Sequence, residues 1–157
     1  MHSLKIISGG QTGVDRAALD AEIANDFNCG GYCPKGRLAE DGKIPMKYPL
    51  IEILQKSYNE RTLKNVLSSD ATVIIYFSKL KGGTKLTHKF LMENEKKFLL
   101  INGSVESSKS AVNNIYEFVS KNNIKVLNFA GPRISVNKGG YLKAYEVIDG
   151  FLKKYPD

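Results

Sequence analysis

A glycine-rich turn near the N-terminus constrains the fold most, because it joins an apolar run directly to a helical pattern. Its sequence is Ser8-Gly9-Gly10-Gln11-Thr12-Gly13-Val14-Asp15. Residues 4–7 before it predict a buried strand, and residues 16–24 after it predict a helix. Such a turn can bind phosphate, since glycine lets the backbone approach a ligand and the first helical N–H groups carry partial positive charge. The spacing matches neither G-x-G-x-x-G nor the P-loop, so a plain connector with Thr12 and Asp15 as a capping box is the alternative.

Apolar runs and helical segments alternate along the rest of the chain. We expect strands at residues 4–8, 71–77, 98–101 and 126–130, and helices at 59–69, 84–95, 110–121 and 139–154. Residues 71–77 look apolar on both faces, which is typical of a central parallel strand. Strands separated by helices imply right-handed crossovers. The sequence therefore predicts an α/β fold, with residues 1–157 forming a single Rossmann-like domain whose mostly parallel sheet has helices on both faces.

Three glycine-containing turns directly follow predicted strands, after Ser8, after Phe77 and after Ala130. In a parallel sheet these turns share the carboxyl edge, where ligands bind near a switch in strand order. This convergence predicts a binding site for a phosphorylated ligand. Its candidate residues are Gly9, Gly10, Gln11, Thr12, Gly13, Asp15, Gly82, Gly83, Thr84, Gly131, Arg133 and Ser135.

Several candidates have an alternative role. Arg133 suits a bidentate grip on phosphate, or it pairs with a neighbouring carboxylate. Thr84 caps its helix, binds an oxyanion, or does both. Asp15 would repel an anion placed directly on it, so we expect it to cap the helix, hold an arginine or meet a ribose hydroxyl.

Residues 30–49 are rich in glycine and proline, which predicts about 20 residues of loop. Loops of this length in a small domain are usually functional or disordered, and the apolar side chains here argue against disorder. We expect residues 34–49 to cover the site, anchored by Ile44, Met46 and Tyr48. Lys35 and Arg37 either close over the bound anion or remain solvent-exposed.

The net charge of +7 and the pI near 9.3 favour anionic partners without choosing among them. The lysines are scattered, and no interleaving of aromatic and basic residues suggests a nucleic acid as the partner. No apolar stretch approaches the roughly 20 residues of a membrane span, and no signal-peptide pattern is present. These observations predict a cytoplasmic protein that binds a small molecule, with no membrane partner.

The side chains that carry most catalytic chemistry are sparse. Cys29 and Cys33 are four residues apart, which is not the spacing of a zinc or redox pair, and His2 and His88 are isolated. We therefore expect no protein-ligated metal. No nucleophile has an assignable base, so the pattern favours a non-catalytic binding protein over an enzyme.

Five motifs together resemble one known family. They are the segments at residues 8–20, 33–42, 61–66 with 69–72, 82–84 and 131–133. The resemblance is to the molybdenum carrier family, the circularly permuted YpsA-like branch of the lysine-decarboxylase-like, Rossmann-type superfamily that includes DprA. It implies a ligand that is a nucleotide, is derived from a nucleotide, or is molybdenum cofactor, a pterin that carries a phosphate. Carriers of this kind often form symmetric oligomers, so a homodimer or tetramer is expected.

The same resemblance raises two alternative functions. Related phosphoribohydrolases carry an arginine before the central strand and G-G-x-G-T-x-x-E after it, and Arg61 with Gly82-Gly83-Thr84 looks similar. Three residues past Thr84, however, stands Thr87, which cannot replace the catalytic glutamate as an acid or base. A nucleotide-processing hydrolase is therefore the alternative to a binding protein, and a DprA-like nucleic-acid binder is the more distant one.

Overall fold

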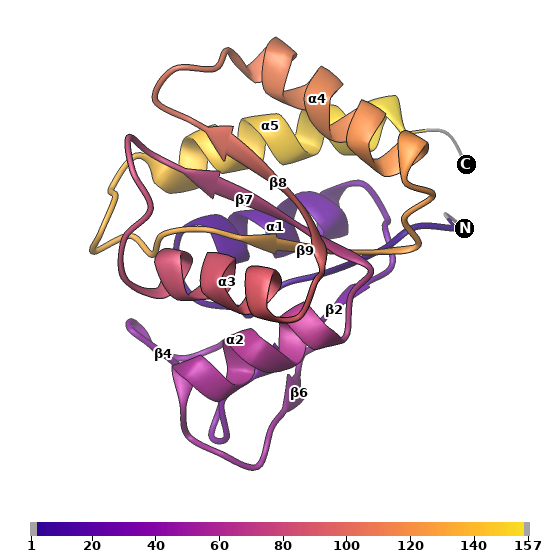
Figure 1. Cartoon of the computed structure of the whole chain (residues 1–157). Coiled ribbons are helices and arrows are strands. Elements are labelled where there is room, and N and C mark those ends of the chain that lie inside the picture. Colours follow the sequence, from indigo (N-terminus) through magenta and orange to yellow (C-terminus); the bar gives the residue numbers. More distant parts are fainter. Residues whose placement is uncertain (1–2, 156–157) are drawn as a thin grey trace.

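Five parallel strands form the central sheet in the computed structural model, which describes residues 3–155 (Figure 1). The strands are β1 (Lys5–Ile7), β2 (Cys29–Gly30), β7 (Ala71–Tyr76), β8 (Lys97–Asn102) and β9 (Val126–Ala130). They pair in the order β2-β1-β9-β7-β8. The predicted α/β Rossmann-like fold is confirmed, and the four expected strands are neighbours in the sheet. The short edge strand β2 was not predicted.

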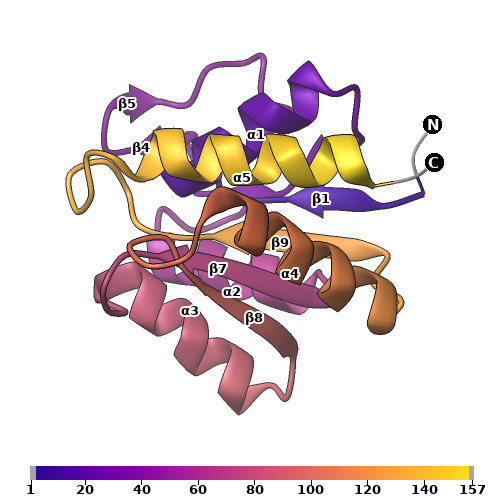
Figure 2. The same cartoon turned by 90° about the horizontal axis from the view of Figure 1, so that it is seen from above.

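Helices cover both faces of the sheet (Figures 1 and 2). On one face lie α1 (Val14–Ala24), α4 (Ser108–Lys121) and α5 (Gly140–Lys154). On the other lie α2 (Tyr58–Leu67) and α3 (Gly82–Glu93). Alternate residues of β7 point to opposite faces, so Val73 and Ile75 enter the larger core and Ile74 the smaller. Burial of both faces explains why this strand is apolar throughout.

The start of α1 does not form the capping box that was the alternative interpretation of the first glycine turn. The helix begins at Val14 with Gly13 as its N-cap, and no side chain caps it. Gly13 has a φ of 82°, and a Cβ there would lie 2.3 Å from the carbonyl oxygen of Pro132. Only glycine satisfies this conformation and this close approach. Thr12 therefore lies outside the helix, and its hydroxyl accepts from the backbone N–H of Ile134 at 3.2 Å.

The connections after β1 and β7 leave the sheet towards opposite faces. β1 leads into α1 on one face, whereas β7 leads into α3 on the other. β9 lies between these two strands. The carboxyl ends of β1, β9 and β7 therefore form a topological switch point, where open parallel sheets leave a crevice for ligands.

Residues 29–52 contain more regular structure than predicted. β3 (Tyr32–Cys33) pairs in parallel with β6 (Ile51–Glu52), and β4 (Leu38–Ala39) forms a hairpin with β5 (Gly42–Lys43). A small apolar cluster anchors the segment to α1; it consists of Leu19, Cys33, Ala39, Ile44, Tyr48 and Leu50. Ile44 and Tyr48 are buried as expected, but Met46 is 72% exposed and is not an anchor.

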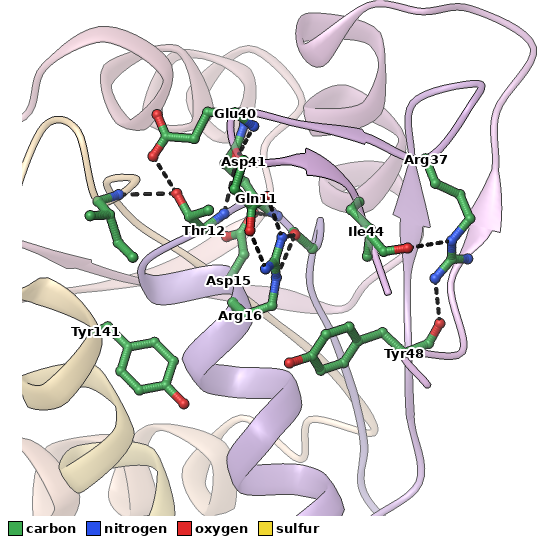
Figure 3. Close-up of polar contacts among 12 residues, drawn as sticks. Gln11, Thr12, Asp15, Arg16, Arg37, Glu40, Asp41, Ile44, Tyr48 and Tyr141 are labelled. Atoms are coloured by element: carbon green, nitrogen blue, oxygen red, sulfur yellow. Dashed lines mark hydrogen bonds and ion pairs between the residues drawn. The ribbon is translucent and has the colours of Figure 1, made fainter. Parts of the chain in front are cut away.

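Polar contacts complete the attachment of this segment (Figure 3). Arg16 donates to both carboxylate oxygens of Asp41, at 2.9 and 3.2 Å, and to the carbonyl oxygen of Gly10. Asp20 of α1 accepts from the hydroxyl of Tyr48 at 2.6 Å and from that of Tyr141 at 2.5 Å. These contacts join the segment to α1, and Asp20 in turn links α1 to α5.

Candidate functional site

A cleft of about 250 Å³ lies at the carboxyl ends of the strands. It is bounded by the β1–α1 turn, one side of α2, the start of α3, and β9 with the turn that follows it. Its position is the one that the switch in strand order predicts. The three glycine turns singled out in the sequence all contribute to it.

Arg61 of α2 crosses to the first glycine turn. Its Nη1 donates to the carbonyl oxygen of Gly9 at 2.8 Å and lies 3.3 Å from Oδ2 of Asp15. A Cβ on Gly9 would lie 2.0 Å from this nitrogen, so the glycine leaves room for the guanidinium. The Nε of Arg61 is buried and has no hydrogen-bond partner among residues 3–155. Arg61 thus holds the turn and lines the cleft at the same time.

Burial governs the charge of Asp15. Desolvation raises the pKa of its carboxyl group to about 6, against the opposing attraction of Arg61 and the weaker effect of a hydrogen bond from the Gln11 N–H. Arg16 of the same helix also favours the charged form. Asp15 therefore holds an arginine, one of its predicted roles, and does not cap the helix.

The start of α3 presents a helix N-terminus to the cleft. Its N-cap, Lys81, makes no side-chain capping hydrogen bond, and no acidic residue occupies the first turn. Gly82 has a φ of 49°, and a Cβ on Gly83 would meet nothing within 4 Å. Thr84 is buried beside them. Free helical N–H groups, the helix dipole and a lysine at one place are the elements of an anion site.

The turn after β9 fits closely against its neighbours. A Cβ on Gly131 would lie 2.4 Å from the carbonyl oxygen of Ile75, so glycine lets the turn pass close to β7. On the preceding strand, the side chain of Asn128 donates to the hydroxyl of Thr72 at 3.1 Å. These contacts fix the cleft wall from which Arg133 extends.

Glu40, at the tip of the β4–β5 hairpin, binds residues predicted to hold a ligand. Its carboxylate accepts from the hydroxyl of Thr12 (Figure 3) and from the N–H and hydroxyl of Ser135, at 3.1 and 2.5 Å. The Nε of Arg133 lies 3.6 Å from Oε2 of Glu40. The alternative role of Arg133, a pair with a carboxylate, is therefore present in this structure.

The predicted site residues fall into two groups. Those that line the cleft are Gly9, Gln11, Asp15, Gly82, Gly83, Thr84, Gly131 and Arg133. Those that do not are Gly10, Thr12, Gly13, Lys35, Arg37 and Ser135. Gly10 has a φ of 77° and faces the side chains of Leu50 and Ile44, so it accommodates residues 34–50.

Residues 34–49 do not line the cleft, contrary to the expectation from the sequence that they cover the site. They pack against the first glycine turn and, through Glu40, contact the turn after β9. Lys35 is exposed. Arg37 is buried, with its guanidinium bound to backbone carbonyl oxygens of the same segment, so it stabilises that segment and is turned away from the cleft.

The contribution of α2 was largely missed from the sequence. Only the family resemblance points to Arg61. Further lining residues from this helix are Tyr58, Asn59, Thr62 and Asn65. Lys81, Thr87, Asn128 and Val136 also line the cleft. The polar face of α2 was a usable signal, but its pattern does not tell which edge of the sheet the helix meets.

Neither a metal-ligating cluster nor a membrane-spanning helix is present in the described part of the chain. Within residues 3–155, no cluster of three or more histidine, cysteine or acidic side chains could hold a metal ion; His2 lies outside that range. No helix in the described part of the chain is long and apolar enough to cross a membrane.

The fold and cleft define a class: α/β proteins of Rossmann type with a ligand-sized crevice at the switch point. The family described as circularly permuted YpsA SLOG matches residues 6–152, and the chain belongs to this family. A crystal structure from Syntrophus aciditrophicus, described as a putative molybdenum carrier protein, is similar at 44% sequence identity and a TM-score of 0.92. The similarity covers 94% of each chain. A search among curated proteins found no significant match.

Proposed function

We propose that this protein binds a phosphorylated small molecule in the cleft, with the phosphate at the N-terminus of α3. The observation that carries this proposal is the uncapped helix start facing a cleft to which Lys81, Arg61 and Arg133 also contribute. Backbone N–H groups and arginines are the donors that phosphate oxygens prefer. The volume is on the small side for a nucleotide-sized ligand, so we expect part of the ligand to extend beyond the cleft mouth.

Molybdenum cofactor is the named candidate, because the solved relative is described as a putative molybdenum carrier protein. The residues present fit two parts of this group. The open space at Gly83 suits its phosphate, and the Asp15 carboxylate is an acceptor suited to the N–H groups of a pterin ring. When bound, the cofactor would supply the molybdenum chemistry, whereas this chain would bind and shield it. A nucleotide is the other candidate.

We favour binding without turnover. The hydroxyl of Thr87 donates a hydrogen bond to the carbonyl oxygen of Gly83 at 3.0 Å, so this hydroxyl is already bound to the backbone of α3. We further propose a cytoplasmic homodimer or tetramer that does not bind nucleic acid. Native mass spectrometry after gentle anaerobic purification would report both the ligand and the oligomeric state.

A substitution at Gly83 tests the anion site directly. Gly83→Asp should weaken binding of orthophosphate about tenfold or more, because a carboxylate would stand where the anion binds. It should leave the fold intact, since a Cβ there meets nothing within 4 Å and an acidic group near a helix N-terminus is stabilising by about 0.3–1 kcal/mol. Isothermal titration calorimetry and thermal unfolding measure the two effects.

Gly83→Asn is the matched control, because it adds a side chain of the same shape without charge. It should retain most of the phosphate affinity. Equal phosphate affinity in the wild type, Gly83→Asp and Gly83→Asn would place the anion elsewhere and contradict the proposed site.

A further inference from the structure

The donors around Glu40 form the kind of set that binds an oxyanion. Two hydroxyl groups, one backbone N–H and one guanidinium converge on its carboxylate, from Thr12, Ser135 and Arg133. Thr12 is only 6% exposed, so its hydroxyl is held in place. Although partial burial opposes ionisation, hydrogen bonds from Ser135 and Thr12 keep the pKa of Glu40 below its usual value. These donors therefore stabilise a fully ionised group at the position of the Glu40 carboxylate.

This donor set adjoins the cleft. Arg133 belongs to both, because it lines the cleft and lies beside Glu40. Gln11 also lines the cleft, and its side-chain oxygen accepts from the N–H of Thr12 at 3.0 Å and from that of Glu40 at 2.9 Å. An anion that replaced the Glu40 carboxylate would therefore be next to a ligand in the cleft.

Other contacts hold the hairpin independently of Glu40. Asp41 pairs with Arg16, and Ala39 lies in the apolar cluster beside α1. The side chain of Glu40 can thus leave its donors without detaching residues 34–50. The Glu40 side chain is 21% exposed, so an anion from solvent can reach its donors and exchange with the carboxylate.

We propose that Thr12, Arg133 and Ser135 form a second anion subsite at the rim of the cleft, and that Glu40 fills it until a ligand with two anionic groups displaces the carboxylate. This rests on the proposed function, because the first anionic group would bind at the α3 N-terminus. The ligand class is a molecule with two phosphates, or with a phosphate and a second acidic group. Glu40 then sets specificity, since a ligand with a single anionic group gains nothing from displacing it.

The test compares orthophosphate with pyrophosphate and tripolyphosphate, by calorimetry at one pH and ionic strength. Glu40→Gln should raise the ratio of polyphosphate affinity to orthophosphate affinity about tenfold, because it removes the competing charge and keeps the shape. Glu40→Ala should raise the same ratio. Asp41→Asn is the matched control: it removes one charge from the same hairpin without opening the subsite, and the ratio should stay at the wild-type value.

The possible failures are distinguishable. If orthophosphate binds but the ratio is unchanged in both Glu40 variants, Glu40 is only a structural contact and the second subsite is wrong. An equal rise in Asp41→Asn would show a general charge effect, which also overturns the subsite. If no phosphate probe binds the wild type or any variant, the proposed function itself fails. Thermal unfolding of each variant confirms that the compared proteins are folded.

Discussion

Replacing Arg37 with methionine should lower the free energy of unfolding by about 3 kcal/mol. The Arg37 side chain donates to four backbone carbonyl oxygens within residues 44–50, at 2.8–3.2 Å (two of these contacts appear in Figure 3). Two of these oxygens, those of Pro45 and Tyr48, also accept from backbone N–H groups. Methionine fills a similar volume but leaves the carbonyl oxygens of Ile44 and Leu50 without this donor.

Lys35→Met is the matched control, because it removes the same charge two residues away. Lys35 is exposed, and its substitution should change the free energy of unfolding by no more than about 0.5 kcal/mol. Urea unfolding measures both variants, and hydrogen exchange in residues 38–50 should accelerate only in Arg37→Met. Equal, small effects would mean that Arg37 does not hold this segment.

Arg37 and Lys35 also show what the sequence alone does not predict, namely which of two nearby cations is buried. Both are cations in one glycine-rich segment, and nothing in the local pattern says which one turns inward. Arg37 has a φ of 55°, a conformation that is uncommon outside glycine, and its guanidinium meets carbonyl oxygens up to 13 residues away. Such a contact depends on the path of the whole segment, which residue types and spacing do not specify.

The fold was predictable because its signals lie within each segment of the sequence. Strand β7 and helices such as α4 can be recognised by the apolar pattern within the segment. The turns that follow parallel strands then lie on one edge of the sheet. The glycine turns of the cleft could therefore be located from the sequence. Arg61 required the knowledge that α2 crosses to the first glycine turn, and the position of Glu40 required the docking of the β4–β5 hairpin.

Asp15 should make stability depend on pH in a direction opposite to that of an ordinary ion pair. Burial raises the pKa of the folded-state carboxyl to about 6, from 3.8 in an unperturbed aspartate. The folded protein therefore holds this proton more tightly than the unfolded chain does. Its contribution to stability is fully present below about pH 3.8 and is lost as the pH rises through about 6. Had Arg61 dominated, the pKa would be lowered and the sign reversed.

The comparison with Asp15→Asn isolates this group, because asparagine has a similar shape and no charge to titrate. Between about pH 4.5 and 8, the free energy of unfolding of the wild type should fall by about 2 kcal/mol relative to the variant. Urea unfolding of both proteins across this range measures the difference, since most other titrating groups cancel. A difference that is constant with pH, or that grows in favour of the wild type, would contradict the raised pKa.

The affinity for an anionic ligand should also depend on the protonation of Asp15. An ionised Asp15 in the cleft repels an anionic ligand, so the wild type should bind sulfate more tightly below about pH 6 than above it. Sulfate is a suitable probe because its own charge does not change in this range. In Asp15→Asn this pH dependence should be strongly reduced, and affinity near pH 8 should exceed that of the wild type. Calorimetry on both proteins at about pH 5 and 8 measures these affinities. If Asp15→Asn bound sulfate more weakly than the wild type at the higher pH, the carboxylate would instead assist binding by holding Arg61.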